Sequence, residues 1–339
     1  MAKQQKNIQF NKPSVNNLEC QAITKVLNSG WLAAGPETEA FEKEFADYVG
    51  VKYAIFTNSG TSALKMAYKC LKELRGYNLM FYHKNTFCAT FSAAEEIGIK
   101  TYPMEDNFLD INLSKKKAFA TTVHYGGVLD LRKSFAVGKK KNRIPVLVED
   151  SAHRIESNDP LIGRIRCYSF YATKNMTTGS GGMLVTNNKK IYQRCRLYWK
   201  DGISLSTDQR RKIPGTKSRI YNITALAGGY DGNDISAAIG RVQLKKLPGF
   251  TLRRNKIVSL YNESFGQKWG GNHLYPIFLK SEKDIKRFIN FLDKKGIGCG
   301  YHYPGTGWLG VSLPLYPLLS KSEIDFVINS VAEYKLIKS

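Results

Sequence analysis

The sequence alternates short apolar segments with longer amphipathic ones, and this alternation restricts the fold more than any other feature. The short segments have the length and residue types of buried strands, and the longer ones carry apolar residues at helical spacing. Strands that alternate with helices predict a mostly parallel sheet with helices on both faces, so we expect an α/β fold. The expected strands lie at 52–57, 78–83, 119–124, 145–148, 167–171 and 182–186, and the expected helices at 16–28, 36–49, 62–74 and 87–96.

The pattern starts again in the last third of the chain. A helix at 235–247 is expected to end at Pro248, and a helix rich in Arg and Lys follows at 252–265. A chain of 339 residues is longer than one hydrophobic core usually holds. We therefore predict a large domain at 1–249 and a smaller α/β domain at 250–339, packed closely together. Further strands and helices are expected at 273–279, 282–295, 300–303 and 321–334.

Composition excludes several classes of protein. No long uncharged apolar run is present, so we expect no membrane span. The first ten residues, MAKQQKNIQF, lack the apolar block of a secretory signal. The six cysteines are scattered without paired CxxC spacing, which argues against a zinc site and a disulfide framework. We expect a cytoplasmic protein with no metal site and with reduced, mostly buried thiols.

The net charge of +23 raises the possibility of a nucleic-acid or membrane-surface partner. The basic residues form short clusters along the whole chain, without a long basic tail or an aromatic-interleaved stripe. We therefore interpret the charge as a solvated surface that attracts anionic substrates mildly, and we expect no nucleic-acid partner. The clusters lie at 115–117, 139–141, 210–212, 245–246, 253–254 and 294–295.

Three segments carry residues suited to chemistry, and the first is Asn58-Ser59-Gly60-Thr61, between an expected strand and an expected helix. Backbone N–H groups at a helix N-terminus have no intrahelical partner, and the helix dipole favours an anion there. Gly60 allows the backbone to approach a phosphate closely. Taken alone, an ordinary helix cap is the simpler interpretation.

The second segment runs from an apolar strand into two acids and a histidine, Glu149-Asp150-Ser151-Ala152-His153. In open α/β sheets, ligands bind beyond the carboxyl ends of the strands. A carboxylate at that edge is placed to pair with a cationic ring nitrogen. The alternative is an acid that caps the following helix.

The third segment places Lys174 after an alternating strand and before the glycine-rich turn at 179–182. Most lysines lie on the surface, and that is the alternative here. An imine-forming lysine needs a closed, partly apolar place that favours its neutral amine. The aromatic and apolar residues at 167–172 are compatible with such a place.

Together these segments resemble the DegT/DnrJ/EryC1/StrS family of pyridoxal-phosphate (PLP) dependent sugar aminotransferases, of fold type I. The likeness covers almost the whole chain, and its motifs follow one another in the family's order. Besides the three segments, the matching motifs are Ser29-Gly30-Trp31-Leu32, Asn85-Thr86-Phe87, His124-Tyr125-Gly126, Ala237-Ala238-Ile239-Gly240, Gly296-Ile297-Gly298, His302-Tyr303-Pro304 and Leu313-Pro314-Leu315-Tyr316-Pro317.

The resemblance implies a role for each matching residue. Lys174 would hold PLP as a Schiff base and move protons, and Asp150 would pair with the pyridinium nitrogen. His153 would act near the ring hydroxyl or the substrate, or would be a structural histidine. Phe87 would stack on the ring or be a core aromatic. The cofactor-binding residues implied in this way are Ser59, Gly60, Thr61, Phe87, Asp150, His153, Ser169, Lys174 and Asn233.

The sequence departs from the family pattern in three places, all of which affect substrate recognition more than cofactor chemistry. Ala33 and Ala34 stand where relatives often carry hydroxyl residues. The stretch 228–233 replaces the usual Gly-Tyr-Asn-Tyr-Arg, which often reaches a neighbouring subunit's cofactor. The loop at 304–313 is short for the family.

The resemblance implies transfer of an amino group from glutamate to a keto-sugar, with a nucleotide-linked 4-keto-6-deoxy sugar as the expected substrate. Pyridoxamine phosphate would be the intermediate form of the cofactor, and the expected assembly is a homodimer. The alternatives are a PLP-dependent sugar dehydratase, a cyclitol aminotransferase, and a lapsed fold that only binds a partner. Dehydratases of the family tend to lack the Schiff-base lysine, so Lys174 favours aminotransfer.

Overall fold

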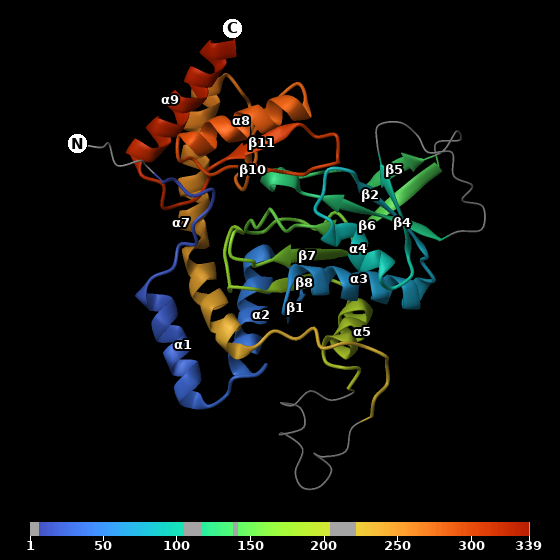
Figure 1. The fold of residues 1–339 in the computed structure, drawn as a ribbon. Helices are drawn as coiled ribbons and strands as arrows, with labels where there is room; N and C mark the ends of the chain where they lie inside the picture. The colour runs from blue at the N-terminus through green and yellow to red at the C-terminus, as the bar shows by residue number, and fades with distance from the viewer. Residues whose placement is uncertain (1–6, 105–116, 138–141, 204–221, 339) are drawn as a thin grey trace.

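The structure is a computed structural model that describes residues 7–104, 117–137, 142–203 and 222–338. Figure 1 shows a large α/β unit built around one sheet and a smaller unit that contains α8 and α9. Of the basic clusters, 139–141, 210–212 and two residues of 115–117 lie outside the described ranges.

The large sheet confirms the predicted α/β class and its mostly parallel arrangement. Along its main path every strand runs in one direction except β8, which pairs antiparallel with both neighbours. A further strand, β5 (Ser134–Val137), pairs antiparallel with β6 and was not predicted. The path runs β1 (Tyr53–Thr57), β8 (Gly182–Thr186), β7 (Ile165–Ser169), β6 (Asn142–Asp150), β4 (Ala118–Val123), β2 (Leu79–His83), β3 (Lys100–Met104).

Helices cover both faces of this sheet, because alternate residues of each strand point to opposite sides. In β1, Ile55 packs into one apolar cluster, whereas Ala54 and Phe56 pack into another. Three helices cover the first face and two cover the second. The first set is α3 (Gly60–Arg75), α4 (Ala89–Glu95) and α5 (Lys189–Trp199), and the second is α2 (Pro36–Val49) and α7 (Asp234–Phe265).

The prediction that a helix ends at Pro248 is wrong. Helix α7 continues through this proline to Phe265. Proline removes one backbone hydrogen bond and usually kinks or ends a helix. Here both flanks are held by packing, since Leu244 and Leu247 lie in the core of the large unit and Ile257 lies in that of the small unit. Helix α1 (Asn17–Ser29) packs beside the first half of α7.

The smaller unit has its own apolar core, in which the end of α7 and the segment around Ile8 pack together. Ile8 pairs with Ile297, so the beginning of the described chain lies against the small unit. The predicted domain boundary at 249/250 falls inside α7 and stays a prediction. The elements of this unit are β9 (Tyr275–Phe278), α8 (Glu282–Lys294), β10 (Gly300–Tyr301), β11 (Gly310–Leu313) and α9 (Lys321–Lys338).

Two expectations from composition can be compared with the structure. Cys70, Cys167 and Cys195 are buried, whereas Cys20 and Cys88 are exposed, so the thiols are less buried than expected. Within the described ranges, no helix is both long and apolar enough to cross a membrane.

The carboxylate of Asp234 joins the start of α7 to the start of α2. Its Oδ1 accepts hydrogen bonds from the N–H groups of Gly35 and Thr38 at 2.8 and 2.9 Å and from the Thr38 hydroxyl at 2.7 Å, and Oδ2 accepts from Glu37 N at 3.1 Å. Asp234 is only 1% exposed. A buried carboxylate at a helix N-terminus accepts hydrogen bonds from N–H groups that the helix leaves unpaired, and its negative charge interacts favourably with the helix dipole.

We predict that Asp234→Ala lowers the free energy of unfolding by about 3 kcal/mol, because it leaves four donors unpaired. Asp234→Asn keeps the shape and should cost about 1 kcal/mol. Urea unfolding followed by circular dichroism measures both changes. Asp47→Ala, which removes an exposed acid of α2, is the control and should change little. Equal midpoints for Asp234→Ala and Asp47→Ala would contradict the role assigned to Asp234.

Candidate active site

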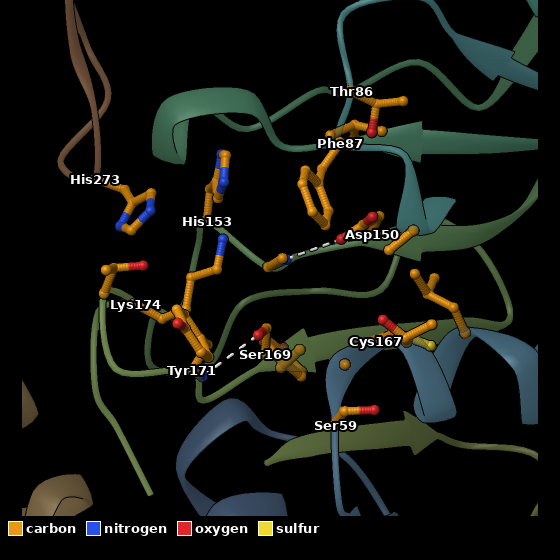
Figure 2. Close-up of a pocket in the computed structure, with 18 of the residues that line it drawn as sticks. Ser59, Thr86, Phe87, Asp150, His153, Cys167, Ser169, Tyr171, Lys174 and His273 are labelled. Atoms are coloured by element: carbon orange, nitrogen blue, oxygen red, sulfur yellow. Dashed lines mark hydrogen bonds between the residues drawn. The ribbon is translucent and has the colours of Figure 1, made fainter. Parts of the chain in front are cut away.

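A cavity of about 470 Å³ opens at the carboxyl ends of β6 and β7. This is the edge at which parallel α/β sheets bind ligands. In Figure 2, Phe87, Asp150, His153 and Lys174 reach one common space from different segments. The cavity brings together most of the residues predicted from the sequence: Ser59, Gly60, Thr61, Phe87, Asp150, His153, Ser169 and Lys174.

One end of the cavity is the N-terminus of α3. The Ser59 side chain caps this helix by accepting a hydrogen bond from Ser62 N at 3.1 Å. The N–H groups of Gly60 and Thr61 have no acceptor among the described residues. A Cβ placed on Gly60 would lie 2.9 Å from the Ser169 Cβ, so glycine allows the helix to approach β7 closely. N–H groups that have no acceptor, next to a serine hydroxyl, are suited to bind a phosphate.

Lys174 lies in the turn that follows β7, and its N–H donates to the Tyr171 carbonyl at 2.9 Å. The side chain is partly accessible from the cavity, but its amine lies deep among protein groups. Desolvation lowers the pKa of Lys174 to about 8, and the opposing charge of Asp150 limits the shift. A substantial fraction of this amine is therefore neutral near physiological pH, as a nucleophilic lysine requires.

Asp150 ends β6, and its side chain is held on two sides. Its Oδ2 accepts from the Thr90 hydroxyl at 2.7 Å and its Oδ1 from Ala152 N at 3.1 Å. The hydroxyls of Thr86 and Thr90 are 2.6 Å apart, so a second threonine supports the first. These contacts fix the carboxylate at the cavity wall and leave it able to accept a hydrogen bond from a protonated ring nitrogen.

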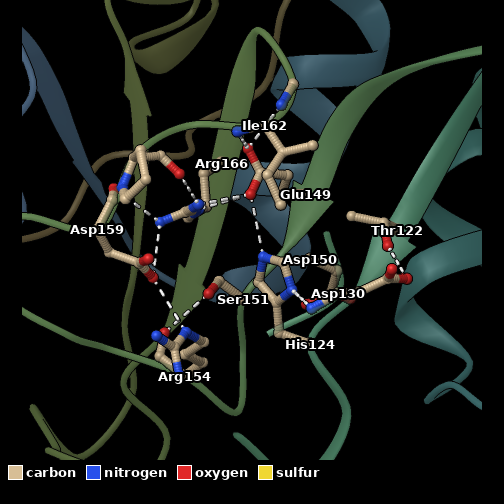
Figure 3. A network of polar contacts seen from close by, with 12 residues as sticks. Thr122, His124, Asp130, Glu149, Asp150, Ser151, Arg154, Asp159, Ile162 and Arg166 are labelled. Carbon is tan, nitrogen blue, oxygen red and sulfur yellow. Dashed lines mark hydrogen bonds and ion pairs between the residues drawn. The ribbon is translucent and has the colours of Figure 1, made fainter. Parts of the chain in front are cut away.

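A buried polar network lies behind Asp150 (Figure 3). Glu149 is fully buried, and its Oε2 accepts from Arg166 Nη2 at 2.6 Å and Nε at 2.9 Å and lies 3.0 Å from His124 Nε2. Its Oε1 accepts from the N–H groups of Ile162 and Gly163, both at 2.8 Å. Burial alone would raise the pKa of Glu149, but His124 and Arg166 outweigh burial and lower it. Glu149 therefore stays ionised and anchors the end of β6.

The predicted site residue His153 is neutral and has a defined orientation. Its Nδ1 accepts from Gly126 N at 3.2 Å, and its Nε2 lies 3.1 Å from the Tyr303 hydroxyl. Burial, together with the charge of Lys174, lowers the pKa of His153 well below its usual range. Gly126 has a φ of 63°, in the left-handed region that glycine adopts readily, and this conformation contributes to the turn that presents its N–H.

Two of the predicted residues differ from the others in their surroundings. Phe87 is 55% exposed, so it is not a core aromatic, and its ring lies 5.8 Å from that of Tyr303. Asn233 does not line the cavity of its own chain. It caps α7, where its side chain accepts from Ser236 N at 2.9 Å. A role for Asn233 in cofactor binding stays a prediction.

The structure adds cavity residues to which the sequence had given no role. His273, His302 and Tyr303 enter from the small unit, and Phe10 and Asn11 from the beginning of the chain. The motif His302-Tyr303-Pro304 was noted in the sequence, but nothing local to it showed which side chain reaches the cavity.

These residues fit PLP. The N–H groups without acceptors and Gly60 at the start of α3 suit a phosphate, Asp150 suits a pyridinium nitrogen, and Lys174, with its lowered pKa, suits an aldehyde carbon. The three groups line one cavity large enough for a drug-sized ligand.

Comparison with known proteins agrees with this chemistry. A match to the DegT/DnrJ/EryC1/StrS aminotransferase family extends over residues 13–310. The spore coat polysaccharide biosynthesis protein SpsC of Bacillus subtilis is 30% identical, over 96% of each chain. The UDP-4-amino-4,6-dideoxy-N-acetyl-beta-L-altrosamine transaminase of Campylobacter jejuni is 29% identical, over 88% of this chain and 84% of the relative.

Solved structures share the fold. Helicobacter pylori PseC, an aminotransferase of pseudoaminic acid biosynthesis, superposes with a TM-score of 0.82 at 23% identity, over 97% of this chain and 99% of its own. The putative sugar aminotransferase Spr1654 of Streptococcus pneumoniae, in its pyridoxamine phosphate (PMP) form, gives a TM-score of 0.81 at 22% identity, over 96% of this chain and 98% of its own. The fold, the cavity and the family match lead to one conclusion: this chain belongs to the DegT/DnrJ/EryC1/StrS family of PLP-dependent sugar aminotransferases.

Proposed function

We propose that this protein uses PLP to transfer an amino group from glutamate to a keto-sugar, and that the sugar is a nucleotide-linked 4-keto-6-deoxy sugar. The observation that carries the proposal is the lysine with a lowered pKa, Lys174, in one cavity with the carboxylate of Asp150. The names of two relatives support the sugar class, since one is a transaminase of a UDP-linked amino-dideoxy sugar and the other serves pseudoaminic acid biosynthesis.

Different residues of the chain have separate roles in the proposed reaction. Bound PLP supplies a carbonyl for the amino group and a ring that accepts electrons. Lys174 would hold the cofactor covalently, and its amine would take a proton from the donor's Cα in the first half-reaction and give a proton to the sugar carbon in the second. Asp150 keeps the ring nitrogen protonated, and Ser59, Gly60, Thr61 and Ser169 bind the phosphate. Phe87 would pack against the cofactor ring.

The two halves of the reaction would follow a ping-pong order, with 2-oxoglutarate leaving before the sugar binds. We further propose that the protein is a homodimer in the cytoplasm. Asn233 does not line the cavity of its own chain, so if it binds cofactor it does so in the cavity of the neighbouring subunit.

We predict that the protein with PLP shows a visible absorbance band that glutamate bleaches. In Lys174→Ala the band should be absent or insensitive to glutamate, because the covalent attachment and the proton carrier are both lost. Lys256→Ala, which changes an exposed lysine of α7, is the matched control and should behave as wild type. No band in the wild type would refute the aminotransferase assignment, and a band that responds to glutamate in Lys174→Ala would refute the role of Lys174.

The pKa of Lys174 predicts how cofactor attachment depends on pH. The amine is protonated below about pH 8 and neutral above it, and only the neutral form attacks a carbonyl. At pH 7 this lysine has on the order of 300-fold more neutral amine than an ordinary one. The rate at which the band forms after PLP is added to the apoprotein should rise about tenfold per pH unit and level off near pH 8.

Asp150→Asn should move this levelling to a lower pH, because the Asp150 charge raises the pKa of the amine. A rate that keeps rising to the pKa of free lysine would show that the amine is not desolvated as the structure indicates.

A further inference from the structure

The hydrogen bond between His153 and Tyr303 joins the two units across the cavity. His153 follows β6 of the large unit, and Tyr303 lies in the small unit. The Tyr303 backbone is held in place, because its carbonyl accepts from the Thr306 hydroxyl at 2.7 Å and the preceding carbonyl, of His302, accepts from the Tyr125 hydroxyl at 2.9 Å. The position of the Tyr303 ring is therefore set by both units.

The direction of this hydrogen bond follows from the partner of the other ring nitrogen. A backbone N–H can only donate, so the bond from Gly126 N makes His153 Nδ1 an acceptor. His153 is 5% exposed, and burial lowers its pKa well below its usual range, so its ring is neutral. A neutral imidazole with an acceptor at Nδ1 carries its proton on Nε2. His153 therefore donates to the Tyr303 oxygen.

The Tyr303 oxygen accepts this hydrogen bond from His153, so the Tyr303 hydroxyl proton points away from His153. A phenol O–H lies close to the ring plane and has two directions available, of which the Nε2–H of His153 occupies one. Burial raises the pKa of Tyr303, so the hydroxyl keeps its proton. Among the described residues, no protein acceptor for this proton is found, and Tyr303 lines the cavity together with Lys174 and Asp150.

We propose that Tyr303 is a directed hydrogen-bond donor in the active site, oriented by the Gly126–His153 pair, and that its acceptor is an oxygen atom of the bound ligand. The proposal rests on the proposed function for the identity of that ligand. Two oxygens have the required chemistry: the ring oxygen of the cofactor, and a carbonyl or hydroxyl oxygen of the sugar. His153 is then a positioning residue that acts through Tyr303.

The polarity of the pair can be measured without any cofactor. The chain has only five histidines, so selective ¹⁵N labelling of histidine gives few signals, and His153→Gln identifies the one that belongs to His153. We expect the ¹⁵N shifts of a neutral ring with its proton on Nε2 across the neutral pH range. A proton on Nδ1, or a charged ring, would overturn the proposal even if the protein proved to have no aminotransferase activity.

The donor role is tested with Tyr303→Phe, which keeps the ring and removes only the hydroxyl. We expect kcat/KM to fall by about tenfold to a hundredfold, as for the loss of one directed hydrogen bond to a reacting oxygen. Tyr301→Phe is the control, since Tyr301 lies two positions away and does not line the cavity. Unchanged kinetics together with an unchanged absorbance spectrum in Tyr303→Phe would overturn the proposal.

The same variant distinguishes the two acceptors. If Tyr303 donates to the cofactor, the pKa of the visible band shifts in Tyr303→Phe before any substrate is added. If it donates to the sugar, the band titrates as in wild type and the loss is confined to the half-reaction with the sugar.

The positioning role of His153 is tested separately. His153→Gln offers an amide N–H in a similar place and should retain much of the activity, whereas His153→Leu should lose it. The loss caused by His153→Leu should be small in a Tyr303→Phe background, because the effect passes through the same hydroxyl. Losses that multiply in the double variant would show that His153 acts independently of Tyr303.

Discussion

The carboxylate of Glu149 is the point on which the geometry of the active site depends. It is fully buried, and an ionised carboxylate in that position must be compensated by every neighbour that can donate. Arg166, His124 and two backbone N–H groups do so. Because successive residues of a strand point to opposite faces, the neighbour of this anchored residue, Asp150, is turned towards the cavity.

The same anchor extends to the histidine side of the cavity. His124 lies against Glu149 through Nε2 and accepts from Asp130 N through Nδ1, so its ring is fixed at both nitrogens. The turn that follows immediately contains Gly126, whose N–H determines the tautomer of His153. The charge of Glu149, a residue that does not line the cavity, therefore influences which cavity groups can donate hydrogen bonds and which can accept them.

The sequence predicted the α/β class, the direction of most strands and a set of residues that the fold does bring to one cavity. The fold class and the segments at 58–61 and 149–153 were predicted from local signals, namely strand periodicity, a glycine at a helix start, and acids at a strand end, whereas Phe87 and Ser169 were expected only from the family resemblance. Two helix boundaries show the limit. Pro248 is a strong local stop, and only packing against two separate cores explains why α7 continues. Phe87 was placed inside a helix, but α4 begins after it, at Ala89.

The small unit's share of the site could not be predicted in this way. Tyr303 and His153 are 150 positions apart in the chain, and their contact depends on how the two units pack. Nothing in the residues around Tyr303 distinguishes its hydroxyl from that of Tyr301, which lies two positions away and does not line the cavity.

The pairing of Ile8 with Ile297 has a consequence for how the chain is made. The segment around Ile8 is synthesised long before the backbone groups that it pairs with, at Gly296 and Gly298. Domains generally fold as units during synthesis, and the amino-terminal parts fold first. Here the Ile8 segment has to remain unpaired until residues 296–298 are made, so the wall of the cavity that contains Phe10 and Asn11 is completed only after the strands of the large sheet have been synthesised.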